Sequence, residues 1–191
     1  MAADDHTPMT DDELRAVTVG ELQELNAPIE LAEYDAEWPR LFDREAKRIR
    51  TALGARALVV EHAGSTSVPG LAAKPIIDIV LVVEDSADER AYVAGLESAG
   101  YVLRIREPDW FEHRLFKGPD TNVNLHVFSR NCDEADRMLL FRDHLRANDD
   151  DRRRYEVAKR ELAARPWRYV QHYADAKSAV VAEIMARAAS T

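Results

Sequence analysis

The sequence predicts an α+β fold, in which a mixed β-sheet with flanking helices is followed by a C-terminal helical segment. Short apolar runs of strand length alternate with turn residues up to about residue 130, and the remainder has the periodicity of consecutive helices. Regular strand–helix–strand alternation is missing, which argues against a doubly wound parallel sheet. The chain has 191 residues, 46% hydrophobic and 32% charged, a balance typical of a globular domain with a sizeable core.

Residues 1–28 form an acidic N-terminal segment that we expect to be partly disordered or helical. Residues 1–30 carry eight acidic side chains and one arginine, a net charge of −7, against −9 for the whole chain. The first nine residues are predicted to be disordered, and Thr10–Glu13 fits a capping box that begins a short helix. The segment could be a solubilising tail, an oligomer contact or a lid over a basic cleft.

Residues 29–130 are predicted to form the α/β core. A helix is expected at 38–53, because Trp38-Pro39 suits a helix start and Gly54 suits its end. A second helix is expected at 88–99, and a loop or short helix rich in small residues at 64–74. The expected strands span residues 29–34, 57–61, 75–83, 101–106, 112–117 and 121–128.

Residues 131–191 are predicted to form a helical segment packed on the core, with helices at 133–148, 149–165 and 173–189. The single cysteine, Cys132, excludes an intrachain disulfide and a multi-cysteine metal site. The acidic N-terminus does not look like a secretory signal, and no apolar run approaches the ~20 residues of a membrane span. We therefore expect a cytoplasmic monomer or homodimer without a membrane partner. The near-neutral body argues against long nucleic acid as a partner.

The segment 61–78 (EHAGSTSVPGLAAKPIID) carries the chemistry that the sequence suggests. Glycine allows backbone N–H groups to approach a ligand closely, and hydroxyls add hydrogen-bond donors. The turn could therefore cradle phosphate groups, Lys74 could neutralise them, and Asp78 could hold a divalent metal. An ordinary loop with Asp78 as a strand-end cap is the alternative, although a carboxylate inside an apolar strand favours a partner or a metal.

Four blocks of this chain resemble the GrpB family and together span about residues 29–186. They are YDAEWPRLFDREAKRIRTALG, EHAGSTSVPGLAAKPIIDIVLVV, FKGPDTNVNLHVF and LLFRDHLRANDDDRRRYEVAKRELA. That family is similar to the nucleotidyltransferase superfamily, whose hallmark is a Gly-Ser turn followed by acidic residues on adjacent strands. The resemblance implies a nucleotidyltransferase-like mixed β-sheet.

The resemblance places Gly64 and Ser65 at the Gly-Ser turn, with Thr66 and Ser67 as further phosphate-binding residues, and Asp78 at the first metal carboxylate. Strand periodicity puts the second carboxylate at Val80, which cannot bind a metal. The third position, on a neighbouring strand, is His126. One aspartate and one histidine, with Glu61 as a further ligand, could hold a single Mg²⁺, Mn²⁺ or Zn²⁺ ion. His126 could instead be a general base.

Three basic residues in the C-terminal segment are further candidates for phosphate binding. Arg142 and Arg146 are spaced i,i+4 on one helix face, which fits either phosphate contact or structural ion pairs. Lys177 resembles the lysine in the family's YADAKS block. Lys117 is interpreted as a rim residue, and Lys159 as a surface or packing residue.

Together these features predict a metal-dependent nucleotidyltransferase-like protein. It would bind a nucleoside triphosphate with Mg²⁺, Mn²⁺ or Zn²⁺ and transfer a nucleotidyl group to an unidentified acceptor. Asp78 and His126 are the expected catalytic residues. The missing acid at Val80 favours a non-catalytic nucleotide or small-molecule binding module. A different small-molecule transferase or ligase on the same scaffold is the third alternative.

Overall fold

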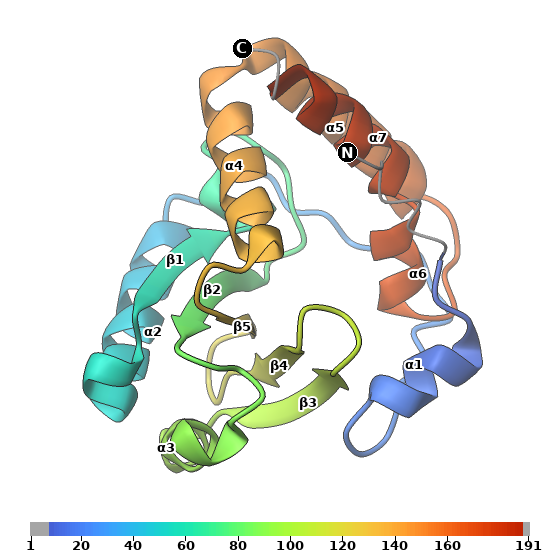
Figure 1. Ribbon diagram of the computed structural model, residues 1–191. Helices are drawn as coiled ribbons and strands as arrows, with labels where there is room; N and C mark the ends of the chain where they lie inside the picture. The colour runs from blue at the N-terminus through green and yellow to red at the C-terminus, as the bar shows by residue number, and fades with distance from the viewer. Residues whose placement is uncertain (1–7, 189–191) are drawn as a thin grey trace.

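The computed structural model describes residues 8–188 and contains a five-stranded mixed sheet in the order β1-β2-β5-β4-β3 (Figure 1). Strands β2 and β5 are parallel, and the other neighbouring pairs are antiparallel. The strands are β1 Val59–Ala63, β2 Ile77–Val83, β3 Val102–Glu107, β4 His113–Lys117 and β5 Val123–Ser129. The α+β fold with flanking helices that the sequence predicts is confirmed.

Seven α-helices and three short 3₁₀ turns surround this sheet in the described part of the chain. The helices are α1 Asp11–Val17, α2 Trp38–Leu53, α3 Val93–Ser98, α4 Asp133–Ala147, α5 Asp149–Ala163, α6 Val170–Asp175 and α7 Ser178–Ala188. The 3₁₀ turns are η1 Gly54–Arg56, η2 Ser65–Ser67 and η3 Glu89–Ala91. Within residues 8–188, none of the helices is long and apolar enough to span a membrane.

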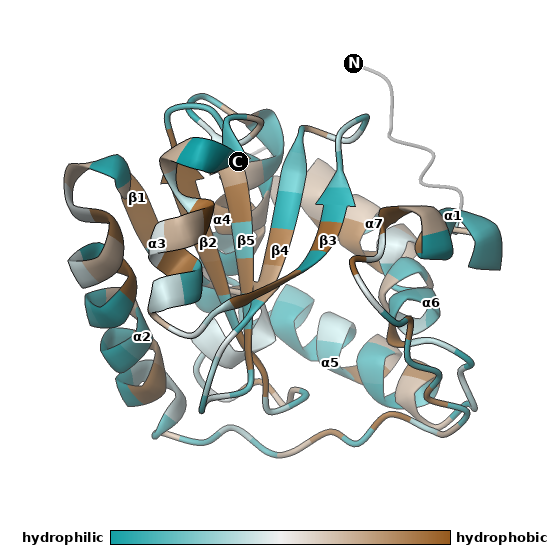
Figure 2. Cartoon of the chain, turned by 90° about the horizontal axis from the view of Figure 1, so that it is seen from below, coloured by the Kyte–Doolittle hydropathy of each residue, from teal (hydrophilic) through white to brown (hydrophobic). Residues whose placement is uncertain are grey.

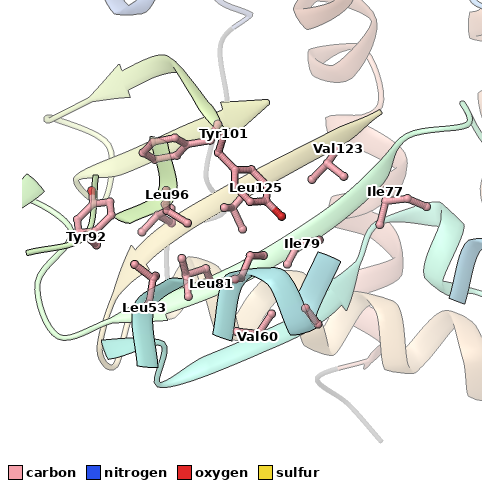
Figure 3. Packing of buried hydrophobic residues seen from close by; sticks show 14 of the residues in the cluster. Leu53, Val60, Ile77, Ile79, Leu81, Tyr92, Leu96, Tyr101, Val123 and Leu125 are labelled. Carbon is pink, nitrogen blue, oxygen red and sulfur yellow. The ribbon is translucent and has the colours of Figure 1, made fainter. Parts of the chain in front are cut away.

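One face of the sheet is covered by α2 and α3 and holds the largest hydrophobic cluster (Figure 3). Ile77, Ile79 and Leu81 alternate along β2 onto this face and are at most 1% exposed. Burial of each such aliphatic side chain contributes about 1.5–3 kcal/mol to folding. Apolar residues run along β1, β2 and β5 beneath the helices in Figure 2. We call this side of the sheet the closed face.

The opposite side, which we call the open face, is only partly covered by apolar contacts. Helix α4 packs over Ala63, Val80 and Phe128 on that side. Further along, α4, α5 and α7 close over the η2 turn, where Leu71 and Tyr155 belong to a second cluster. Figure 1 shows α4 above β1 and β2, with α5, α6 and α7 at one side of the sheet. Beyond α4 the open face carries polar side chains.

Most predicted elements are confirmed, with local shifts in their bounds. The capping box of Thr10 begins α1, and α2 has the predicted bounds. The predicted strand at 57–61 lies two residues later, and the predicted helix at 88–99 consists of η3 followed by the short α3. The sequence predicts a loop or a short helix at 64–74, and residues Ser65–Ser67 of this segment form the short 3₁₀ turn η2.

Two predicted elements are wrong. Residues 29–34 form no strand and make a single bridge between Ala32 and Ala73, because Ile29 bonds instead to the end of α5 at Ala163. The predicted helix at 173–189 is broken into α6 and α7 around Lys177, where the amide of Lys177 bonds three residues back to Ala174. Of the predicted disorder at 1–9, residues 1–7 lie outside the described residues, as does the predicted helix end at Ala189, whereas the amide of Met9 donates to Asp175 Oδ2 at 3.0 Å.

The acidic N-terminal segment contacts the body from Met9 onward, where the Met9 amide donates to Asp175 in α6. Leu14 is 4% exposed, and Thr18 bridges Ile105 beside strand β3. Asp11 and Glu24 both form ion pairs with Arg168, which precedes α6. The described part of this segment is therefore a docked arm rather than a free tail, because its carboxylates meet a complementary cation.

Candidate functional site

The Gly-Ser turn lies directly against Asp78. Antiparallel pairing of β1 and β2 sets Ala63 opposite Asp78, so the next residue, Gly64, begins the turn at the carboxylate. Gly64 has φ +64°, and a Cβ atom there would lie 2.2 Å from Asp78 Oδ2. Only glycine combines this backbone conformation with so close an approach. Glycine is therefore required at position 64 because its backbone lies directly against the carboxylate of Asp78.

Asp78 sits at the edge between buried and exposed surface, with 26% of its side chain accessible. Parallel pairing of β2 and β5 sets Asn124 beside it, and Asn124 Nδ2 donates to Asp78 Oδ1 at 2.8 Å. Burial acts to raise the pKa of Asp78, but hydrogen bonding and charge from His126, together with Asn124 and Lys74, outweigh it. The pKa of Asp78 therefore lies below its ordinary value, and the group is a carboxylate at neutral pH.

His126 lies beside Asp78 on the same face of the sheet. Its Nε2 atom is 3.8 Å from Asp78 Oδ1, and 19% of its side chain is exposed. The two predicted catalytic residues are therefore brought together, because Asp78 and His126 lie on the neighbouring strands β2 and β5 two registers apart.

Lys159 reaches the turn from α5. Its Nζ donates to Ser65 Oγ at 3.0 Å and also to the carbonyl of Ala72, while the residue is 2% exposed. Burial, together with the charge of Lys177, lowers the pKa of Lys159 to about 7. A buried amine at this pKa can be protonated when an anion arrives beside it.

Two further lysines flank the ring of Tyr173 in α6. Nζ of Lys177 lies 4.6 Å from the ring centroid and Nζ of Lys74 5.5 Å from it. Burial and the charge of Lys74 lower the pKa of Lys177 to about 8, and burial also lowers the pKa of Lys74. The hydroxyl of Tyr173 is buried and finds no hydrogen-bond partner among the described residues.

Lys117 completes a group of four lysines around the turn and Asp78. Its Nζ donates to Asn124 Oδ1 at 2.5 Å, and burial lowers its pKa while the charge of Asp78 opposes that shift. We call Lys74, Lys117, Lys159 and Lys177 the lysine group. Positive charge exceeds that of the single carboxylate at its centre, so the site favours an anionic ligand.

The other predicted phosphate-binding residues are engaged by the protein itself. Thr66 Oγ1 donates to the carbonyl of Ile76 at 3.1 Å, and Ser67 Oγ donates to that of Gly64 at 2.6 Å. These two hydroxyls fix the shape of the turn. Within the turn, the hydroxyl of Ser65 contacts the lysine group, because it accepts a hydrogen bond from Lys159 Nζ.

Arg142 and Arg146 have structural partners, which is the second of the two predicted alternatives. Arg142 forms ion pairs with Asp143 and Glu61, at 2.7 and 2.8 Å, and ties α4 to β1. Arg146 donates twice to the carbonyl of Ser67, at 3.0 and 2.9 Å. Arg142 holds α4 against β1 and Arg146 holds it against the turn, and the predicted phosphate contact of both residues stays a prediction.

The predicted metal ligands do not form a metal cage. Among residues 8–188, no three His, Cys, Asp or Glu side chains gather closely enough to hold an ion. Glu61 is paired with Arg142, and Val80 is fully buried beneath α4. The donor set fits a Mg²⁺ or Mn²⁺ ion that arrives on nucleotide phosphates, since such ions need only one or two protein carboxylates. Asp78 would be that carboxylate.

Sequence reasoning did not place Lys117, Lys159 and Tyr173 beside the turn and its neighbouring lysines. Lys159 is 94 residues from Ser65, and its family-like block reads equally well as a charged helix surface. The only signal was the four-residue spacing of Tyr155 and Lys159, which places both on the buried side of α5.

The GrpB protein family matches residues 28–187 of the chain. This protein belongs to the GrpB family. A UPF0157 protein of Halalkalibacterium halodurans is 69% identical over 185 residues, covering 97% of this chain and 95% of the relative. A UPF0157 protein of Streptomyces coelicolor is 51% identical over 160 residues, covering 84% of each chain.

The crystal structure of the conserved protein GrpB from Enterococcus faecalis has the same fold as this GrpB-family chain. The TM-score is 0.71 at 31% identity, covering 83% of this chain and 98% of that one. A dephospho-CoA kinase of Mycolicibacterium paratuberculosis is also similar, at 33% identity over 165 residues. The match covers 73% of this chain but only 40% of that kinase.

Proposed function

We propose that this GrpB-family protein binds the phosphate groups of a nucleotide and transfers a nucleotidyl group to an acceptor. The observation that carries the proposal is the lysine group, which surrounds the turn at Ser65 and the carboxylate of Asp78. Partly buried amines with lowered pKa values are destabilised until a counter-charge arrives. A polyphosphate supplies that counter-charge and several acceptor oxygens.

Each residue of the site has a part in this proposal. Lys159 and Ser65 would bind phosphate oxygens as one linked pair of donors, because Lys159 Nζ already lies 3.0 Å from Ser65 Oγ. Lys74 and Lys177 would meet the remaining phosphate charge beside Tyr173. A Mg²⁺ or Mn²⁺ ion, when bound, supplies charge neutralisation at the transferred phosphate, and Asp78 is the residue that would hold it.

A binding protein without transfer activity is the second candidate, and Val80 favours it. Two-metal transferases place a further carboxylate near this position, whereas Val80 is 0% exposed and packs against Phe128. The two candidates share the ligand and differ only in turnover. Release of pyrophosphate from the bound nucleotide separates them.

The kinase-named relatives suggest one ligand to include. Dephospho-CoA kinases of two mycobacterial species match this chain over 40% and 46% of their own lengths. Dephospho-CoA, a nucleotide-containing molecule, therefore joins the common nucleoside triphosphates as a probe.

The first experiment is a thermal-shift screen against the four nucleoside triphosphates, dephospho-CoA and inorganic phosphate. Each would be measured with Mg²⁺, Mn²⁺, Zn²⁺ or EDTA. A ligand at a hundred times its Kd stabilises the folded state by about 2.7 kcal/mol, which raises Tm. We expect one nucleotide to shift Tm most strongly with Mg²⁺ or Mn²⁺. A screen with no shift for any phosphate-bearing probe would reject the proposal.

Substitutions then test which residues bind. Lys159→Met and Lys177→Met should each weaken nucleotide binding about tenfold, the effect of losing about 1.4 kcal/mol. Asp78→Asn should remove the dependence on metal but keep binding in EDTA. The matched control is Lys47→Met on α2, which removes one exposed charge remote from Asp78 and should leave Kd unchanged.

A further inference from the structure

The turn between β3 and β4 carries two adjacent aromatic residues, Trp110 and Phe111, beside the open face of the sheet. Trp110 is partly exposed and packs against Phe128, one of the residues beneath α4, at a centroid distance of 6.3 Å. The Phe111 ring lies 5.4 Å from that of Trp110, and Phe111 is 40% exposed. We call Trp110 and Phe111 the aromatic corner. It presents aromatic surface to solvent.

The backbone of this turn is strained in a way that keeps the corner exposed. Phe111 and Glu112 both have positive φ angles, +53° and +51°, which are uncommon for residues other than glycine. The carbonyl of Glu112 fixes this conformation, because it accepts hydrogen bonds from Ser86 Oγ at 2.9 Å and from Arg114 Nη1 at 2.8 Å. Such strain costs folding free energy and is concentrated at sites that bind ligands. The exposed position of Phe111 is therefore imposed by the fold.

The neighbouring rings leave the indole of Trp110 without a parallel partner. Within residues 8–188, the rings that contact it are those of Phe111, His113 and Phe128, at interplanar angles of 80°, 88° and 64°. These are edge-to-face contacts, whereas a nucleobase stacks parallel to an aromatic side chain. A flat ring can therefore stack on Trp110 without replacing a stacked ring of the protein.

The aromatic corner and the lysine group lie at opposite ends of β4. Lys117 of the lysine group ends this strand, and His113, whose ring lies 5.3 Å from that of Trp110, begins it. At about 3.3 Å per residue, the five residues of β4 place its two ends about 13 Å apart. The partly exposed His126 lies between them, opposite the middle of β4. A nucleotide with its β- and γ-phosphates at the lysine group carries its base at the far end of the molecule, so the base can reach the aromatic corner.

We propose that the aromatic corner binds the nucleobase of the nucleotide whose phosphates lie at the lysine group. This inference rests on the proposed function and names the ligand as a whole nucleotide rather than a bare polyphosphate. Trp110 stacks on one face of the base, and Phe111 contacts its edge. Every nucleobase has a π-face, so the contact tolerates all four bases and raises affinity about tenfold or more over that of the phosphates alone.

Calorimetric titration with two probes tests this inference. The probes are inorganic tripolyphosphate and the nucleoside triphosphate with the largest thermal shift, which share three phosphates and differ by the nucleoside. With Mg²⁺ present, the wild-type protein should bind the nucleotide at least about tenfold more tightly. Trp110→Ala should weaken nucleotide binding about tenfold, equivalent to about 1.4 kcal/mol, and leave the Kd of tripolyphosphate unchanged. Trp110→Phe, which keeps an aromatic face, should restore most of the affinity for the nucleotide.

Two further variants and a second readout guard against an effect on folding. Phe111→Ala changes an exposed side chain and should weaken nucleotide binding less than Trp110→Ala does. Val157→Ala removes an apolar side chain on α5 that is 56% exposed, and as the control it should leave both Kd values unchanged. The nucleotide should also quench the fluorescence of Trp110, whereas tripolyphosphate should not. Trp110→Phe should lose this quenching and still bind the nucleotide.

The outcomes separate this inference from the proposed function. Equal affinity of the wild-type protein for the two probes would overturn the nucleobase site and leave phosphate binding in place. A Trp110→Ala protein that binds the nucleotide as tightly as the wild type, or that loses affinity for both probes equally, would also overturn the nucleobase site alone. Binding of neither probe to the wild-type protein would overturn the proposed function and this inference with it.

Discussion

The two faces of the sheet are built from alternate residues of the same strands, yet they meet different neighbours. On the closed face, Ile77, Ile79 and Leu81 of β2 lie beneath α2 in continuous apolar packing. On the open face, Asp78 and Val80 come from the same strand, and α4 covers only the second. Asp78 is therefore a partly exposed carboxylate, whereas Val80, two residues further along β2, is fully buried.

The closed face provides stability, whereas the open face holds the site where we propose that a ligand binds. The closed face buries a continuous row of apolar side chains along β2 and β5, and its buried hydroxyls have partners, as Tyr92 donates to the carbonyl of Ser86 at 2.6 Å. The open face keeps a group of lysines with lowered pKa values and a buried tyrosine hydroxyl without a partner. Such unsatisfied groups cost folding free energy, which is typical of a site prepared for a ligand.

The largest expected effect tests whether Val80 lies in the part of the open face that α4 shields from water. Val80→Asp places at this position the carboxylate that nucleotidyltransferases carry. Because Val80 is 0% exposed and packs against Ala63 and Phe128, the unpaired charge should cost about 4 kcal/mol of unfolding free energy. Urea denaturation measures it. The partly exposed Val82 on the same face is the control, and Val82→Asp should cost less. A stable Val80→Asp protein that gained Mn²⁺ binding would contradict this assignment.

The next effect tests the contact between the turn and Asp78. Gly64→Ala combines a positive φ with a Cβ atom 2.2 Å from Asp78 Oδ2, so it should cost about 3 kcal/mol through strain and overpacking. Gly70→Ala has a similar φ, +78°, but its Cβ atom meets nothing within 4 Å. It should cost about 1 kcal/mol. Equal losses in the two variants would mean that the close approach to Asp78 is unimportant.

A smaller effect concerns the pH dependence of stability. The pKa of Lys159 falls from 10.5 to about 7 on folding, chiefly through burial. The unfolded chain therefore binds more protons between these values, and unfolding free energy should rise with pH there, by about 1.4 kcal/mol per pH unit at most. Lys159→Met should flatten this rise, whereas Lys47→Met should not. Denaturation curves across this range provide the measurement, and identical slopes for wild type and Lys159→Met would refute the assignment.

The smallest effect compares one tyrosine from each face. Tyr173→Phe removes a buried hydroxyl that has no partner among residues 8–188, so it should leave stability unchanged or raise it by about 1 kcal/mol. Tyr92→Phe removes a bonded hydroxyl on the closed face and should lower stability by about 1 kcal/mol. Thermal unfolding of the ligand-free proteins gives both values. A loss for Tyr173→Phe as large as that for Tyr92→Phe would show that the two hydroxyls are equally satisfied.

Local patterns were sufficient for much of the fold and for the centre of the site. The helix at Trp38–Leu53 follows from its apolar spacing and Gly54, and strand β2 from its apolar run. Asp78 stood out because a carboxylate interrupts that run. Sequence patterns failed at 29–34 and around Lys177, where bonds to distant residues decide whether a strand or a helix continues.

The sequence by itself determined most of the helices and strands and the turn that lies beside Asp78, because those depend on residues near one another in the chain. Only the tertiary structure decided which basic residues face that turn. Arg142 and Arg146 are held by protein acceptors, whereas Lys159 reaches Ser65 from 94 residues away. It also decided that Glu107, His113 and His126 line up across three strands toward Asp78. The physical reason is that burial and strand register, which fix charge and hydrogen-bond partners, arise only when distant segments pack together.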